Sequence, residues 1–166
     1  MLLLAHNRGK QSEGDSWSAH VAIPADAGEV LRTLTDPELI ATWAPVDFDL
    51  ERADGSPLQA GRHERVSGSI AGLSVSFGIE VIRADRSRLE LLADGPVTFE
   101  VEYRFRQRKD SVAVDASVGI RRKGGLAAQV LRAAAGALLS AGALDHALQR
   151  LEESVCKRLG PELAAA

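Results

Sequence analysis

Few residues in this sequence have types and spacings that could carry chemistry, and the clearest pair is Arg62 and Glu64. They lie two positions apart in a predicted β-strand, so both side chains leave the same face. In the register expected for a hairpin turning at Ala71-Gly72, that face is the apolar one. A charge among apolar side chains must be paired or in contact with something. We expect an ion pair that gives a ligand directional contacts, or two solvated charges if this end of the strand lies at an open mouth.

The other candidate motifs do not indicate a metal, nucleotide or nucleophile site. None of the four histidines has a metal-ligand spacing with another histidine, a cysteine or a pair of carboxylates. The sequence contains no phosphate loop, dinucleotide fingerprint or Gly-x-Ser-x-Gly motif. Gly14-Asp15-Ser16 lacks the following glycine of a hydrolase motif. We therefore expect no metal and no cofactor.

Length and charge narrow the class of protein. A chain of 166 residues is sufficient for one domain, which we place at residues 16–160 between a frayed tail at 1–15 and a short tail at 161–166. The net charge of -3 provides no basic field for nucleic acid. The single cysteine, Cys156, excludes an internal disulfide framework and suits a reducing, cytoplasmic location. The oligomeric state stays open.

Neither apolar stretch of the chain predicts a membrane anchor. The N-terminal run is too short for the core of a signal peptide and has no charge before it. Residues 126–144 approach the length of a membrane span but include Gln129, Arg132 and Ser140. An arginine in the middle of a span costs about 2.5–3.5 kcal/mol. We expect no stable membrane insertion.

The N-terminal part of the domain predicts one strand and two short helices. Alternating apolar residues over 16–23 indicate a half-buried strand. Asp26 with Glu29 forms a capping box at the start of the first helix. Asp36-Pro37 caps a second helix that ends before Pro45.

Six further strands follow, with turns between them and no helical period. They are predicted near residues 46–52, 62–70, 73–82, 88–93, 97–106 and 112–121. A three-residue loop at 94–96 would place Leu91 opposite Phe99, and a two-residue loop at 108–109 would place Phe105 opposite Val112. In these registers all the apolar rows share one face, which predicts a single antiparallel sheet.

Residues 125–159 predict one long C-terminal helix. They contain no proline and repeat apolar or small residues at a three-and-four spacing, which indicates one buried face: Leu126, Val130, Ala134, Ala137, Leu138, Ala141, Leu144, Leu148, Leu151 and Val155. At about 1.5 Å per residue this helix would be longer than a small domain needs. We therefore expect a bend near Gly136 or Gly142.

The order of elements and one local stretch resemble a known superfamily. Ala22-Ile23-Pro24-Ala25, Val30, Leu34, Asp36-Pro37-Glu38 and Trp43 are similar to the opening of SRPBCC proteins, the START-like and polyketide-cyclase-like helix-grip proteins. Leu31 departs from this pattern, because the family often has an aromatic residue there. The resemblance implies an α+β helix-grip fold: a seven-stranded curved antiparallel sheet around the C-terminal helix, two short helices between strands one and two, and a ligand cavity.

The sheet and the helix together predict an elongated apolar cavity. A sheet that curves around one helix has more inner area than the helix covers, and the helix offers small residues there. We expect ligand contacts from Trp43, Arg62, Glu64, Phe77, Leu91, Phe99, Val101, Tyr103 and Ala134.

Three functions remain open. The first is a carrier or sensor that binds a hydrophobic or aromatic small molecule. The second is a cyclase or dehydratase-type lyase without metal or nucleotide cofactor, for which Arg62, Glu64 and Tyr103 are the only acid–base candidates. The third is an assembly factor that acts through its surface, which would require an exposed apolar patch.

Overall fold

The computed structural model describes residues 15–44, 46–51, 55–121 and 124–160. The elements in chain order are β1 (Asp15–Ile23), α1 (Ala27–Thr35), α2 (Pro37–Trp43), β2 (Phe48–Leu50), β3 (His63–Ile70), β4 (Leu73–Ala84), β5 (Arg88–Asp94), β6 (Thr98–Gln107), β7 (Val112–Arg121), α3 (Leu126–Ser140) and α4 (Ala143–Leu159).

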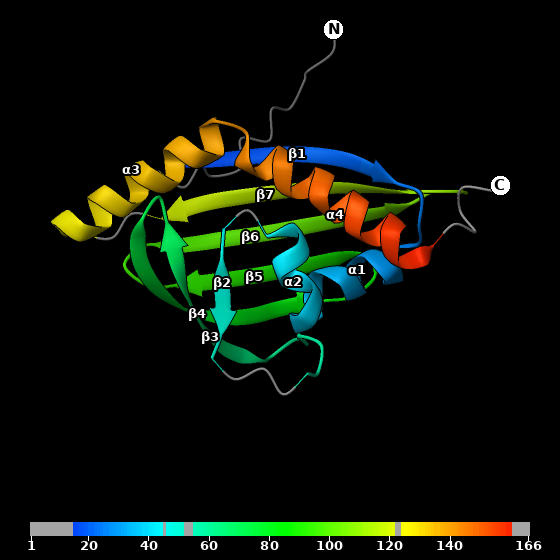
Figure 1. Cartoon of the computed structure of the whole chain (residues 1–166), viewed down its shortest axis with the longest axis horizontal. Coiled ribbons are helices and arrows are strands. Elements are labelled where there is room, and N and C mark those ends of the chain that lie inside the picture. Colours follow the sequence, from blue (N-terminus) through cyan, green and yellow to red (C-terminus); the bar gives the residue numbers. More distant parts are fainter. Residues whose placement is uncertain (1–14, 45, 52–54, 122–123, 161–166) are drawn as a thin grey trace, which may run out of the picture.

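The seven strands form one antiparallel sheet in the order β1-β7-β6-β5-β4-β3-β2. All four helices lie on one face of this sheet, with α3 and α4 running along its β1 side and α1 and α2 beside them (Figure 1). The predicted α+β helix-grip architecture is confirmed, including the two short helices between the first two strands.

Both short helices begin at the predicted caps. The Asp26 side chain accepts a hydrogen bond from the backbone N–H of Glu29 at the start of α1. Asp36 accepts from the N–H of Glu38 at the start of α2, where Pro37 occupies the first turn. These bonds satisfy backbone donors that a helix start leaves unpaired. The caps thereby set where the two helices begin above the sheet.

The strand registers confirm the predicted faces but correct two predicted pairings. Around Ala71-Gly72 the pairing is as predicted, with Val66 opposite Phe77 and Glu64 opposite Ile79. Leu91, however, pairs with Val101 rather than Phe99, and Phe105 pairs with Val114 rather than Val112.

Local hydrogen bonds in the turns explain both differences. Thr98 Oγ1 donates to Asp94 Oδ1 at 2.8 Å, so the loop spans residues 95–97. Arg108 N donates to Ser111 O at 2.8 Å, which closes a four-residue turn. Each register differs from the prediction by two positions. Because side chains alternate with a period of two, every residue keeps its predicted face.

The C-terminal helix is broken at Gly142, one of the two predicted positions. The axes of α3 and α4 differ by 59°. Gly142 has φ of 95°, in the left-handed region that glycine adopts without a steric penalty. Gly136, the other predicted position, continues inside α3.

The break overturns the prediction of one continuous buried face along residues 125–159. In α4 the predicted stripe is buried, with Leu144, Leu148, Leu151 and Val155 against the sheet and α1. In α3 the buried residues are instead Ala128, Leu131 and Ala135. The predicted residues Leu126, Val130, Ala137 and Ala141 are exposed. A bend at Gly142 changes the direction of the helix axis, so one stripe cannot face the sheet on both sides of it.

The core consists of two clusters that meet in the middle of the inner face. One lies under α4 and includes Leu89, Tyr103, Val114 and Leu151. The other lies under α3 and includes Phe77, Val97, Ile120 and Leu131. Phe99 and Leu139 are partly buried and pack against both clusters. The junction of the clusters is therefore less completely covered than either centre.

Candidate ligand-binding site

Three apolar residues that face inward at the centre of the sheet are only partly buried, and they are called the accessible patch below. Leu91 on β5 and both Phe99 and Val101 on β6 are only partly buried. The neighbouring residues on either side of this patch are buried: Leu89 and Ala93 on β5, Tyr103 on β6, and Val97 just before β6. Because β5 is the central strand of seven, the patch does not result from exposure at a sheet edge. It lies where the two core clusters meet.

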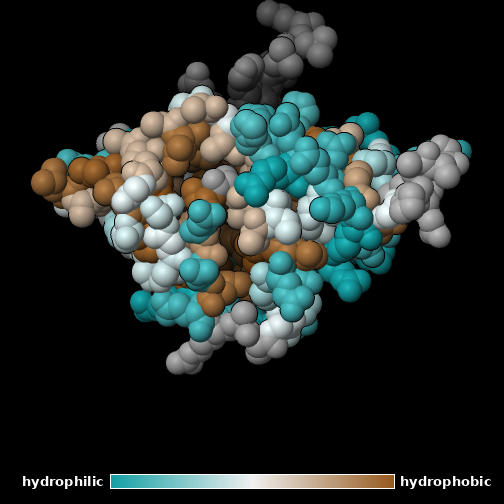
Figure 2. All heavy atoms as spheres, viewed as in Figure 1, coloured by the Kyte–Doolittle hydropathy of each residue, from teal (hydrophilic) through white to brown (hydrophobic). Residues whose placement is uncertain are grey.

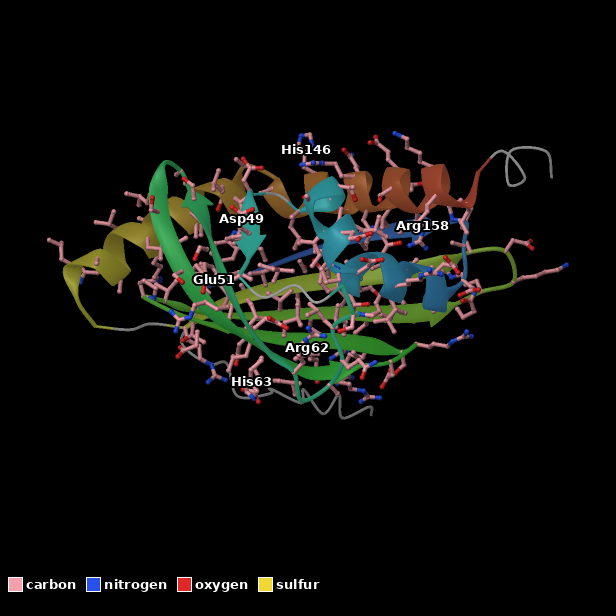
Figure 3. The ribbon with its side chains drawn as sticks, turned by 60° about the horizontal axis from the view of Figure 1, so that its bottom comes forward. Asp49, Glu51, Arg62, His63, His146 and Arg158 are labelled. Carbon is pink, nitrogen blue, oxygen red and sulfur yellow. The ribbon has the colours of Figure 1, made fainter. Side chains whose placement is uncertain are left out.

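The ion pair of Arg62 and Glu64 lies on the same face, toward the β3 edge. Arg62 Nε donates to Glu64 Oε1 at 2.5 Å, and Arg62 Nη1 donates to Ser56 Oγ at 2.5 Å. The Glu64 side chain is 8% exposed and that of Arg62 is 21% exposed. His63, in contrast, is exposed and opposes Glu80. Arg62 and His63 lie on opposite sides of the chain in Figure 3. Most of the Glu64 side chain and much of the Arg62 side chain are therefore shielded from solvent.

Arg62 joins the strand ladder through its backbone. Val81 N donates to Arg62 O at 3.0 Å, so Arg62 lies opposite Val81 as predicted. Across the sheet Val81 pairs with Leu91, and Leu91 pairs with Val101. Arg62 is thus in the same cross-strand row as the accessible patch, two strands away from Leu91.

Tyr103 lies next to the accessible patch on its α4 side, two residues after Val101 on β6. Trp43 packs edge-on against it, with ring centroids 6.4 Å apart, and Trp43 Nε1 donates to Thr33 O at 3.1 Å. Burial raises the pKa of Tyr103 well above its ordinary value, so the hydroxyl stays protonated at neutral pH.

Phe77 and Ala134 lie on the α3 side. Phe77 is buried and packs edge-on against Phe99, with ring centroids 5.4 Å apart. Ala134 is half-buried on α3, beside Ala135, which is buried in the α3 cluster. The structure therefore places Phe77 with the accessible patch through Phe99. It places Ala134 at the margin of the sheet-facing side of α3.

Sequence reasoning missed Ser56 and Leu139. Ser56 lies in the irregular segment between β2 and β3, and no pattern connects it to Arg62 before folding. Leu139 was not distinguished from the other leucines of the C-terminal stretch. Its contact with both clusters depends on where α3 ends, which the helical period alone does not determine.

The outer face of the sheet carries charged side chains and two surface depressions. Their volumes are about 440 and 480 Å³. The first is lined by Arg88, Arg104, Arg106 and Asp115. The second includes Leu91 and Val101, which present only main chain to this side because strand side chains alternate. Neither depression lies between the sheet and the helices, where the cavity was predicted.

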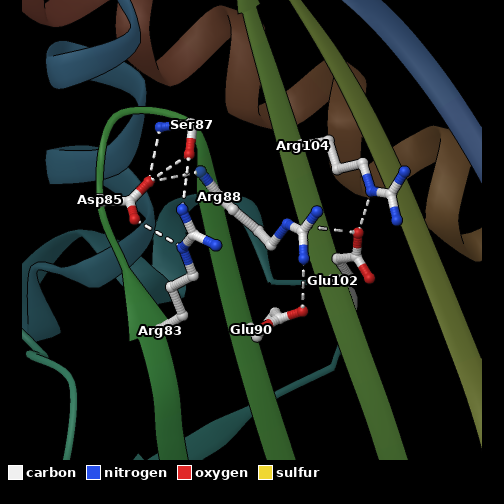
Figure 4. Close-up of polar contacts among 7 residues, drawn as sticks. All are labelled: Arg83, Asp85, Ser87, Arg88, Glu90, Glu102 and Arg104. Carbon is white, nitrogen blue, oxygen red and sulfur yellow. Dashed lines mark hydrogen bonds and ion pairs between the residues drawn. The ribbon is translucent and has the colours of Figure 1, made fainter.

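Ion pairs neutralise much of this outer face. Figure 4 shows Asp85 accepting from Arg83 and Ser87, and Arg88 shared between Glu90 and Glu102. Hydrogen bonds from Ser87 and Arg83 lower the pKa of Asp85 well below its usual range. Water screens exposed pairs of this kind, so they add little to stability. The pattern is that of a solvated sheet face with paired charges.

The described residues contain no group of three or more histidine, cysteine, aspartate or glutamate side chains that could hold a metal ion. Within the same residues, no single helix is both long and apolar enough to cross a membrane, and α3 with α4 would meet that requirement only as a bent pair.

Comparison with known proteins shows the fold. No family model matches the chain, and no curated protein is similar to it in sequence. Among solved structures, a START superfamily protein from Mycobacterium smegmatis is 20% identical with a TM-score of 0.62, and the match covers 87% of this chain and 98% of that one. A protein from Chromobacterium violaceum is 14% identical with a TM-score of 0.62, over 84% and 96% of the two chains.

DynU16, a putative protein in the dynemicin biosynthetic locus, is 22% identical with a TM-score of 0.51. That match covers 81% of this chain and 47% of DynU16, so this chain spans about half its length. The predicted likeness to START-like helix-grip proteins is thus confirmed as a likeness of fold.

Proposed function

We propose that this protein binds a hydrophobic small molecule between the inner face of the sheet and its C-terminal helices, as a carrier or sensor. The observation that carries the proposal is the partial exposure of Leu91, Phe99 and Val101. They lie at the centre of the inner face, between buried neighbours along the same strands. An apolar ligand at this position would remove their remaining accessible surface from water, at about 25 cal/mol for each Å².

The polar groups around the patch define which ligand it would favour. Arg62 supplies a guanidinium that is already oriented by Glu64 and Ser56, and it suits a carboxylate, sulfonate or carbonyl. The Tyr103 hydroxyl supplies a donor or acceptor from the other side. We therefore propose an aromatic or aliphatic ligand with a polar group at one end. The single cysteine fits action in a reducing cytoplasm.

A lyase of the cyclase or dehydratase type is the second candidate, and Tyr103 is the observation that favours it. A protonated hydroxyl on a buried tyrosine could act as a hydrogen-bond donor to a reacting carbonyl. The enzyme would also need a base. Glu64 is the nearest candidate on the inner face, but it is held by Arg62. We favour binding over catalysis because a lyase needs a free base. The candidate base, the Glu64 carboxylate, is already engaged in an ion pair with Arg62, which leaves the Tyr103 hydroxyl as a donor without a matching base.

The test is a titration with 1-anilinonaphthalene-8-sulfonate, which combines an aromatic body with an anion. We expect saturable binding with a stoichiometry of one and a rise in fluorescence. A parallel titration of Leu126→Ser controls for dye bound to the exposed surface of α3, and it should give the same affinity. Native mass spectrometry of the purified protein should reveal a co-purified small molecule. Absence of saturable binding in the titration would refute the proposed site.

A further inference from the structure

The two depressions on the outer face of the sheet differ in charge. The first, of about 440 Å³, has three arginines and one carboxylate in its lining: Arg88, Arg104, Arg106 and Asp115. The second, of about 480 Å³, is lined within the described chain by three carboxylates and no basic side chain: Glu90, Glu100 and Glu102. Positive charge is thus concentrated in the first depression, which we call the arginine depression.

The three arginines belong to two neighbouring strands. Arg88 on β5 lies directly opposite Arg104 on β6, and Arg106 follows two residues later on the same face. Side chains directly opposite each other start about 4.5–5.5 Å apart, and diagonal neighbours are within reach of long side chains. Like charges in opposed positions are unfavourable. An anion held between the guanidiniums would remove this repulsion.

Carboxylates of the chain use only part of the donor capacity of these arginines. Arg104 donates to Glu102 through Nε, and Arg106 donates to Asp115 through Nη2 at 2.8 Å. Arg88 uses Nη1 and Nε for its two glutamate partners (Figure 4). A guanidinium carries five N–H donors, so other donors of all three remain available within the described residues. Because water screens these pairs, an incoming anion can replace a carboxylate at little cost.

The surroundings of the arginine depression favour a soluble ligand over a membrane surface. The exposed large apolar side chains of the described residues lie outside its lining: Leu73, Ile82, Leu126 and Val130. Two of these are on α3, and Figure 2 shows hydrophobic colour gathered at the α3 end of the helix-covered face. A surface that lies on a bilayer needs apolar side chains beside its basic ones. The volume of the depression, about 440 Å³, is typical of a site for a small molecule.

We propose that the arginine depression binds a phosphate monoester carried by a soluble small molecule. The phosphate oxygens accept N–H bonds from Arg104 and Arg106, with Arg88 beside them, and the carboxylates that pair with these arginines move aside. A phosphate monoester has three terminal oxygens and nearly two negative charges at neutral pH, so it satisfies several guanidiniums at once. This site is separate from the proposed site on the inner face, because strand side chains alternate and Phe105, between the two β6 arginines, is buried in the α4 cluster.

Isothermal titration calorimetry of the full chain with phenyl phosphate, at fixed ionic strength, tests the proposal. We expect saturable binding with a stoichiometry of one, and weaker binding of benzoate, which carries a single charge on the same ring. Arg104→Gln should weaken phenyl phosphate binding about tenfold, because it removes charged donors to the phosphate. Glu102→Gln should strengthen binding about twofold to fivefold, because it removes the carboxylate that competes for Arg104.

Arg121→Gln is the matched control. The Arg121 side chain is 61% exposed and that of Arg104 is 60% exposed, and both pair with a glutamate, but Arg121 does not line the depression. The control removes the same charge and should leave the affinity within about twofold. The proposal is overturned if phenyl phosphate does not bind saturably, if benzoate binds as tightly, or if Glu102→Gln binds no more tightly. Equal losses in the two arginine variants also overturn it, since binding would then reflect overall charge. So does a loss in Arg62→Met but not in Arg104→Gln, because the anion would then occupy the inner face.

Discussion

Arg62 and Glu64, two positions apart on one side of the chain, hold each other at 2.5 Å between Nε and Oε1 on the inner face of the sheet. Ser56 Oγ accepts from the same guanidinium at 2.5 Å. The arginine is thus oriented by two segments, the irregular segment between β2 and β3 and β3 itself. Its side chain nevertheless keeps 21% of its surface accessible. This combination of fixed orientation and remaining access is what a site for an anionic group requires.

Single replacements of Arg62 and Glu64 should distinguish their contribution to ligand affinity from their contribution to the free energy of unfolding. Arg62→Met should lower the free energy of unfolding by about 1–3 kcal/mol, because it leaves the nearly buried Glu64 carboxylate without its guanidinium. It should also weaken binding of 1-anilinonaphthalene-8-sulfonate. Glu64→Gln should cost less stability, since Arg62 can still contact Ser56 and water. Denaturant titration and calorimetry measure the two quantities. Unchanged affinity in both variants would show that the ligand site lies elsewhere.

Enlarging a side chain at the accessible patch should be tolerated better than enlarging one in the filled core. Val101→Phe should change the free energy of unfolding little and should reduce dye binding, because the ring occupies space that a ligand would fill. Val114→Phe is the matched control, at a fully buried position in the α4 cluster. Overpacking there should cost about 1–3 kcal/mol. Equal costs for the two variants would mean that the patch is already filled.

The two glycines of the C-terminal helices should respond to alanine in opposite directions. Gly142→Ala puts a Cβ at φ of 95°, and we expect a loss of about 1 kcal/mol although no atom lies within 4 Å of that Cβ. At Gly136 the new Cβ would contact the Trp17 ring at 3.6 Å, an ordinary van der Waals distance. Alanine should therefore stabilise α3 by about 0.5–1 kcal/mol. Thermal unfolding of the Gly142→Ala and Gly136→Ala variants measures both effects. A higher melting temperature for Gly142→Ala would argue against a helix break at Gly142.

Leu144→Asp should unfold the domain or reduce its melting temperature strongly. Leu144 is buried in the α4 cluster, and an unpaired carboxylate there costs several kcal/mol, about the stability of a small domain. His146→Asp is the control on the same helix, because His146 is exposed and a negative charge near a helix start is favourable. Circular dichroism during heating distinguishes the variants. A normal melting temperature for Leu144→Asp would contradict burial of α4.

The sequence by itself determined the order of the elements, the caps at Asp26 and Asp36, and the face on which each strand residue lies. These follow from local rules: a cap needs a side-chain acceptor at the helix start, and strand side chains alternate. The predicted pairings at residues 94–98 and 107–112 were wrong by two positions, yet the assignment of faces held, because a shift of two leaves alternation unchanged. The inward position of Arg62 and Glu64 was predictable for the same reason.

The tertiary structure alone decided which stripe of α3 is buried and where the inner face stays uncovered. The pattern from Leu126 to Val155 reads as one stripe, but the bend at Gly142 means that only its α4 half faces the core. The accessibility of Leu91, Phe99 and Val101 depends on how far α3 and α4 lie from a curved sheet. That distance depends on the bend between α3 and α4 and on how the assembled helices pack on the sheet. Local periodicity carries no information about it, because each element's pattern specifies its own apolar side and not the space left between two such sides.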